Sequence, residues 1–144
     1  MFRRLISTSA TWVPVPLRLA MGVIFMAHGA QKVLGSFKGP GLGKWIAYPA
    51  PFSFMRPGWV WMGAAAFAEL IGGIFLFFGL LTRLGAFLIA CTMLTAVLGV
   101  LWPAFFAPQG FEYPMSLFAA SLALMISGGG MASIDRAIAG RRRR

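Results

Sequence analysis

The chain has 144 residues, of which 59% are hydrophobic and only 11% are charged. Soluble domains carry about 25% charged residues, so this composition excludes an ordinary water-soluble domain. A formal net charge of +10 would suggest nucleic-acid binding in a soluble protein, but here the basic residues lie beside or between apolar segments. Lipid headgroups are therefore the expected partner, and nucleic acid is not.

Four apolar segments are long enough to cross a bilayer as α-helices, each of which takes about 20 residues. They cover residues 15–34, 58–81, 84–102 and 114–131. None shows the alternating pattern of an outer-membrane barrel strand. The sequence therefore predicts an all-α membrane protein, a four-transmembrane-helix bundle that forms a single domain over residues 1–144. The first segment resembles a signal peptide, but because it continues to Leu34 we expect a retained helix.

The basic residues between the segments predict how the bundle is oriented. The positive-inside rule places the arginine-rich side in the cytoplasm, so both termini are expected there. That side would carry Arg3, Arg4, Arg83, Arg136 and Arg141 to Arg144, and the other side would carry Lys32, Lys38, Lys44 and Arg56. The connection from Gly35 to Pro57 then faces outward. It is long and aromatic, and we expect it to lie back on the bundle as a lid or as an interfacial loop.

Ionisable residues interrupt the first two segments, where each costs roughly 3 kcal/mol to insert. Arg18, His28 and Lys32 share one face of the first helix with its glycines, at 100° per residue. Glu69 lies among small residues on the second helix. Small residues mark faces where helices approach closely, so we expect these four side chains to point into the bundle.

The partner of Glu69 is predicted from depth in the membrane. At 1.5 Å per residue, Glu69 lies about 16 Å deep, between His28 at about 9 Å and Arg18 at about 24 Å. We therefore expect Arg18 or His28 to reach it. One interpretation is a buried charge pair that sets helix register. The other is a polar cavity that binds a ligand through Arg18, His28, Lys32 and Glu69, with Glu69 and His28 as candidate catalytic groups for proton transfer.

Several kinds of cofactor are not expected. Cys91 is the single cysteine, which excludes an internal disulfide or dithiol relay. His28 is the single histidine, which excludes haem ligation by two histidines, and a metal site is not expected either. The chain shows no redox centre of its own. A quinone remains the possible cofactor.

The segments described above match one family pattern in order and spacing. The matching stretches are residues 17–25 (Leu-Arg-Leu-Ala-Met-Gly-Val-Ile-Phe), His28-Gly29 and Lys32, then residues 69–73 (Glu-Leu-Ile-Gly-Gly), Leu76 and residues 79–83 (Gly-Leu-Leu-Thr-Arg), and a glycine-rich end to the last span before Ser133-Ile134-Asp135. In these residues the chain resembles the DoxX family (DoxX/DoxD-like proteins), small four-span proteins of the bacterial or archaeal cytoplasmic (inner) membrane.

The resemblance implies a four-helix bundle and a connection to oxidoreductase systems. Relatives in the family include a subunit of a thiosulfate:quinone oxidoreductase and a membrane anchor in a complex that handles thiol and oxidative stress. The resemblance also carries over Arg18, His28, Lys32 and Glu69 as candidate functional positions. The related four-helix thiol oxidoreductases depend on paired cysteines, which this chain lacks.

Three functions are consistent with these features. The first is a membrane subunit of a quinone-linked oxidoreductase, with electrons supplied by a soluble partner. The second is a non-catalytic accessory subunit of a larger membrane complex, since small residues on the third and fourth segments leave room for neighbouring helices. These small residues are Ala90, Thr95, Gly99, Ala119, Ala120 and Ala123. The third, a proton-coupled transporter, depends on Glu69 and His28 alone.

Overall fold

A computed structural model describes residues 5–106 and 108–141 of the chain, and these residues form helices and no strands. Arg3, Arg4 and Arg142 to Arg144, which enter the predicted orientation, lie outside the described residues. In chain order the helices are α2 (Pro14–Leu34), the 3-10 turn η1 (Ser36–Lys38), α3 (Gly41–Trp45), α4 (Gly58–Phe78), α5 (Thr82–Thr95), the π-helical stretch η2 (Ala96–Leu101), α6 (Glu112–Ser127) and α7 (Ile134–Arg141). The all-helical prediction is confirmed.

The four expected spans correspond to α2, α4, α5 with η2, and α6. Two helices in the described part of the chain are long and apolar enough to cross a membrane, Gly58–Phe78 and Thr82–Leu101. The helix α2 is equally long at 21 residues but carries four polar side chains, and α6 has 16 residues. The four-span topology, the orientation of the termini and the single-domain assignment stay predictions.

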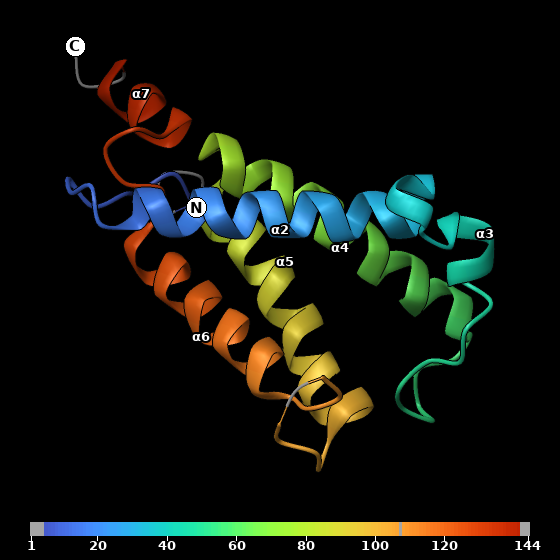
Figure 1. Ribbon diagram of the computed structural model, residues 1–144. Helices are drawn as coiled ribbons and strands as arrows, with labels where there is room; N and C mark the ends of the chain where they lie inside the picture. The colour runs from blue at the N-terminus through green and yellow to red at the C-terminus, as the bar shows by residue number, and fades with distance from the viewer. Residues whose placement is uncertain (1–4, 107, 142–144) are drawn as a thin grey trace.

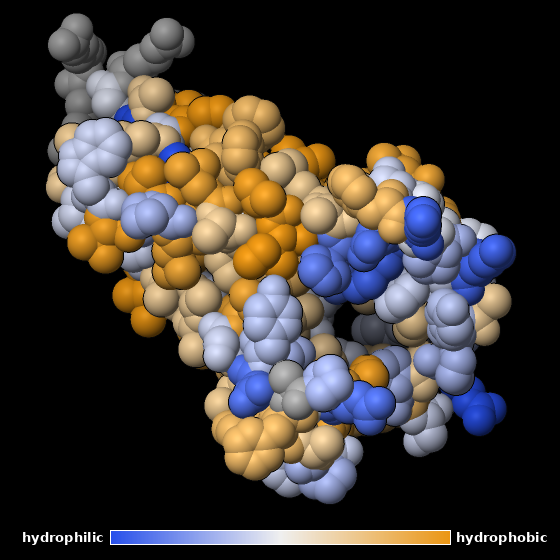
Figure 2. Space-filling view, viewed as in Figure 1, coloured by the Kyte–Doolittle hydropathy of each residue, from blue (hydrophilic) through white to orange (hydrophobic). Residues whose placement is uncertain are grey.

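Large apolar side chains cover the outer faces of these helices, as they do in lipid-facing helices. The exposed ones include Val23, Phe67, Ile71, Ile74, Phe87, Leu94, Leu98, Leu122 and Ile126. Figure 2 shows hydrophobic residues gathered over the helix pairs, whereas hydrophilic residues concentrate at the end of the molecule that carries α3.

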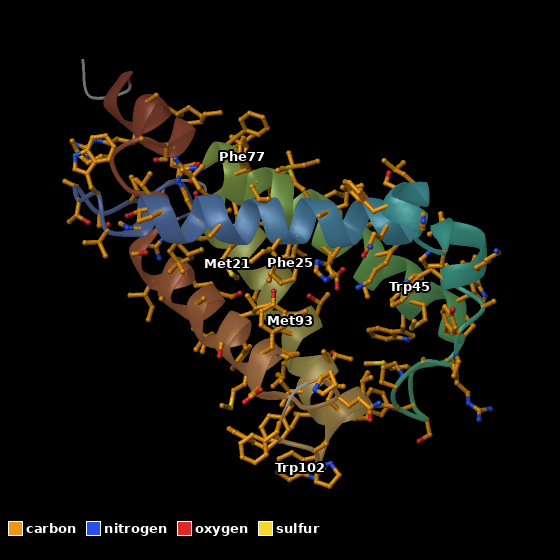
Figure 3. The ribbon with its side chains drawn as sticks, viewed as in Figure 1. Met21, Phe25, Trp45, Phe77, Met93 and Trp102 are labelled. Atoms are coloured by element: carbon orange, nitrogen blue, oxygen red, sulfur yellow. The ribbon has the colours of Figure 1, made fainter. Side chains whose placement is uncertain are left out.

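The helices form two pairs, α2 with α4 and α5 with α6, that converge near the start of α2 and spread apart toward α3 (Figure 1). Buried apolar side chains fill the space between the pairs: Met21, Phe25, Leu76, Ala86, Ile89, Met93, Leu117 and Leu124. Figure 3 shows Met21, Phe25 and Met93 in this region between α2 and α5. The apolar core therefore lies at the converging end and in the middle of the bundle. At the diverging end these core side chains do not fill the space between the helix pairs.

Glycines set the contact between α2 and α4. A Cβ added to Gly29 would stand 2.5 Å from the Leu70 backbone, and one added to Gly73 would stand 2.5 Å from the Met26 nitrogen. Gly22 approaches Phe77 in the same way. The backbones therefore touch along the antiparallel pair, which fixes its register: Gly29 is level with Leu70, and α4 begins about two turns beyond the end of α2.

The loop from Ile46 to Pro57 closes the diverging end. It leaves α3, which is anchored by the Trp45 indole N–H donating to the Met62 carbonyl at 2.8 Å. The loop then crosses to η2, where a Cβ on Gly99 would lie 2.7 Å from Pro51 and 2.8 Å from Phe52. The expected return of this connection onto the bundle is thus confirmed by its contacts.

We expect Gly73→Val to destabilise the bundle by about 1–3 kcal/mol, because its side chain would press against the α2 backbone rather than against a movable side chain. The measurement is reversible unfolding in mixed lipid–detergent micelles. Gly63→Val is the matched control on the same helix, where the nearest neighbour of an added Cβ is Ile46 at 3.7 Å. Equal losses in the two variants would contradict the close α2–α4 contact.

Candidate functional site

Arg18, Lys32 and Glu69, three of the four ionisable residues of α2 and α4, lie in two clusters at opposite ends of α2. We call them the lysine cluster (Lys32, Glu69 and Trp45) and the arginine cluster (Arg18 with its carbonyl partners). Arg18 and Lys32 are separated by about 21 Å along the helix axis. The sequence grouped Arg18, His28, Lys32 and Glu69 around one cavity, and the structure does not bring Arg18 to it.

The lysine cluster joins three elements. The Lys32 ammonium donates to Glu69 Oε2 at 2.5 Å and lies 4.5 Å above the centre of the Trp45 ring. The Glu69 side chain is 5% exposed and that of Lys32 is 16% exposed, so the pair is largely withdrawn from the surface. Lysine thereby links α2 to α4 by charge and to α3 by a cation–π contact.

The structure corrects the predicted partner of Glu69. The sequence indicated Arg18 or His28, whereas the structure pairs Glu69 with Lys32. That prediction assumed that the outer ends of α2 and α4 lie at the same depth in the membrane. Because α4 starts about two turns beyond α2, Glu69 lies near residues 29–32 of α2. The flexible lysine side chain covers the remaining distance.

His28 lies one helical turn before Lys32 and is exposed, so the prediction that its side chain points into the bundle is wrong. Its Nδ1 lies 2.9 Å from the Ile24 carbonyl, which places the proton on Nδ1 as the donor. In the neutral ring Nε2 is then an acceptor that points away from the helix backbone. His28 therefore offers a polar group next to the lysine cluster without contacting Glu69.

A hollow lies beside the lysine cluster. Figure 2 shows the surface hollowed next to α3 with hydrophilic side chains on its rim, and Figure 3 shows the Trp45 side chain extending from α3 toward the same opening. The diverging helix pairs and the loop packed on Gly99 surround this region. The chain therefore places a charged pair and an aromatic face next to a hollow.

The arginine cluster has a structural role that its contacts explain. The Arg18 guanidinium, 3% exposed, donates from Nε to Gly129 O at 2.9 Å and from Nη2 to Ala132 O. Its Nη1 donates to Leu76 O at 3.1 Å and to Phe77 O at 2.5 Å. The last two carbonyls belong to the final turn of α4, where the Leu76 carbonyl also accepts from the N–H of the C-cap residue Gly79 at 3.1 Å and the Phe77 carbonyl has no partner within the helix. Arg18 thus ties α2 to the end of α4 and to the glycine turn that follows α6.

Asp135 completes this end of the molecule, and the sequence did not single it out as a site residue. Its carboxylate accepts from the Leu81 N–H at 2.7 Å, from the Thr82 N–H at 2.9 Å and from the Thr82 hydroxyl at 2.9 Å. These are free donors at the start of α5, so Asp135 caps a helix distant in sequence. The sequence feature that could have indicated Asp135 is its position in the family pattern, where it follows the glycines and Ser133.

A metal or cofactor site would need converging ligands. Within residues 5–106 and 108–141, no three His, Cys, Asp or Glu side chains gather closely enough to hold a metal ion. For a quinone, the lysine cluster supplies a cationic donor and a flat aromatic face, which suit a planar dicarbonyl ring.

Comparisons with known proteins agree with the helical architecture. The family model described as DoxX matches residues 13–102. A Bacillus subtilis (strain 168) protein named "Putative oxidoreductase CatD" is 34% identical over 115 residues, which cover 75% of each chain. No solved structure matches the chain significantly.

The fold and the two apolar spanning-length helices define a helical protein of a membrane-associated class. Within that class, the chain belongs to the DoxX family.

We expect Arg18→Lys to lower the free energy of unfolding by about 1–3 kcal/mol, because one ammonium cannot satisfy the carbonyls of both the end of α4 and the turn after α6 and leaves buried acceptors unpaired. The same unfolding assay measures it. Arg56→Lys is the matched control, since Arg56 is exposed and donates only to the nearby Ser53 carbonyl. If both variants are as stable as the parent, the arginine cluster does not support the fold.

Proposed function

We propose that the chain is a membrane-embedded subunit of a quinone-linked oxidoreductase system, with four spans and both termini in the cytoplasm. Membership of the DoxX family and the name of the Bacillus relative support the oxidoreductase association. The arrangement of charge supports the orientation. Arg83 contacts Ser7 and Ile126 at the end where the described chain starts and finishes, whereas Lys38 and Lys44 lie on η1 and α3 at the other end.

The ligand of this subunit is a quinone headgroup or a small anion, held in the hollow beside the lysine cluster. The observation that carries this proposal is the Lys32–Glu69 pair, whose ammonium lies over the Trp45 ring. A charged pair inside an apolar bundle costs several kcal/mol of desolvation, and such residues in membrane helices mark ligand or proton pathways. A pair that served helix register alone would not need an aromatic wall and a hollow beside it.

The cluster provides the groups that a quinone requires. The Lys32 ammonium is a donor for a quinone carbonyl, and the Trp45 ring is a face for the quinone ring. Conversion between quinone and hydroquinone moves two electrons and two protons. A soluble electron-transfer protein exchanges the electrons, and Glu69, Lys32 and His28 are the groups that exchange protons with the two quinone oxygens.

We expect a short-chain quinone to bind the purified chain in lipid nanodiscs, with Glu69→Gln binding about tenfold more weakly because Glu69 positions the Lys32 ammonium, and with His28→Ala weakening binding of the hydroquinone, whose hydroxyl donates to His28 Nε2. A hydrogen bond to a charged group contributes about 1.5–3 kcal/mol, which corresponds to that factor. Quenching of tryptophan emission measures binding, and chain-free nanodiscs correct for partitioning into lipid.

Arg136→Gln is the control for a polar substitution far from the site, because Arg136 lies on α7 at the opposite end from the lysine cluster. It should bind the quinone as the parent does. No saturable binding, or unchanged quinone affinity in Glu69→Gln together with unchanged hydroquinone affinity in His28→Ala, would refute the quinone site.

A second candidate function, a non-catalytic accessory subunit, is favoured by one face of α6. Ala119 and Ala123 are exposed and lie one turn apart, so a neighbouring helix can approach α6 closely there. Two other small residues that were predicted to leave room for neighbouring helices do not leave it. Ala90 is buried at 5% exposure, and Gly99 is covered by Pro51 and Phe52 of the same chain.

If this accessory role holds, a membrane protein should accompany the chain when it is isolated from its own membrane in mild detergent. Ala123→Phe should lose that partner, because the larger side chain blocks the close approach, while Glu69→Gln should keep it. Mass spectrometry of the purified complex measures both. A monodisperse chain without a partner would rule out the accessory role.

A further inference from the structure

A groove of about 530 Å³ lies at the opposite end of the molecule from the lysine cluster. It runs between α7 and the last residue of α4, and the side chains that matter here are Phe78, Ile134, Ala137 and Arg136. Phe78 is 53% exposed and Ile134 is 41% exposed, so the groove presents apolar surface. Gly140 leaves its far end open, since a Cβ added there would meet nothing within 4 Å.

The walls of the groove are held in place by the contacts at the start of α7. Asp135 turns inward to the Leu81 and Thr82 N–H groups, and the Asp135 N–H donates to the Gly79 carbonyl at 3.0 Å. The Ser133 hydroxyl accepts from the Arg136 N–H at 3.2 Å, which caps α7. With Asp135 facing the bundle, Ile134, Arg136 and Ala137 are left to line the groove.

The charge at this groove is positive. Arg136 makes no ion pair within the described stretches, where Glu69 is paired with Lys32 and the Asp135 carboxylate is engaged by α5. Glu112 starts α6, at the far end of that helix from the groove. An apolar wall next to an uncompensated guanidinium suits a ligand with an anionic head and an apolar tail.

We propose that this groove binds an acidic phospholipid, with the lipid phosphate at Arg136 and an acyl chain against Phe78 and Ile134. The position favours a lipid from the surrounding leaflet, because Phe78 ends the spanning-length helix α4 and α7 follows beyond it. Free phosphate would use the guanidinium but not the apolar wall. The proposal rests on α4 crossing the membrane, as in the proposed four-span arrangement, and does not depend on the quinone site.

The test is native mass spectrometry of the delipidated full chain titrated with phosphatidylglycerol or phosphatidylcholine. The parent chain should prefer phosphatidylglycerol. Arg136→Gln should weaken phosphatidylglycerol binding about fivefold, the effect of about one basic residue near an anionic lipid, and weaken phosphatidylcholine binding less, because the choline cation offsets the charge of its phosphate. Arg56→Gln, an exposed arginine at the opposite end, should bind both lipids as the parent does.

A second pair of variants separates charge from volume. Ala137→Glu should lose phosphatidylglycerol binding, whereas Ala137→Gln, of nearly the same size, should keep most of it. If Arg136→Gln fails to fold, the two Ala137 variants still test whether the groove binds phosphatidylglycerol. Quinone affinity measured on the same samples should stay at the parent value, so failure of the lipid site is distinguishable from failure of the quinone site.

Three results would overturn the proposal. They are equal affinity of the parent for the two lipids, unchanged phosphatidylglycerol affinity in Arg136→Gln and in Ala137→Glu, and displacement of phosphatidylglycerol by inorganic phosphate at equal concentration. The last result would indicate an anion site that has no use for the apolar wall.

Discussion

The backbone contact between α2 and α4 is the constraint on which the other features depend. Gly22, Gly29 and Gly73 allow the two helices to touch, and a side chain at Gly29 or Gly73 would meet main-chain atoms of the partner at 2.5 Å. Rigid backbone contacts at three levels leave one register for the antiparallel pair. That register places Lys32 within reach of Glu69 and Arg18 at the end of α4.

The buried cations of the two polar clusters have different kinds of partner. Arg18 uses its planar fork to satisfy carbonyls from α4 and from the turn after α6, where an apolar side chain would leave those acceptors unpaired. Lys32 is a point charge on a flexible stem, and its contacts are another side chain and an aromatic face. Arg18 binds backbone carbonyls and therefore stabilises the fold. Lys32 binds side chains next to a hollow, so its ammonium can exchange one of these partners for a ligand.

The diverging helix pairs account for the location of the hollow. Apolar side chains fill the converging end, but at the other end the pairs separate and the loop from Ile46 to Pro57 spans the gap to η2. Trp45 ties this loop to α4 through Met62 and to α2 through Lys32. The same tryptophan thus holds the closure in place and faces the charged pair.

The sequence by itself determined the helical class, the approximate limits of the four long helices and the inward positions of Arg18, Lys32 and Glu69, but it was wrong for His28, which is exposed. Hydrophobicity and helical periodicity are local properties, so a single chain displays them directly. Only the tertiary structure decided which of these groups meet. The pairing of Lys32 with Glu69 depends on the stagger of two helices, and the Asp135 cap on Thr82 joins residues 53 apart in the chain. Distances between helices follow from backbone contacts and loop paths, which periodicity along one helix does not contain.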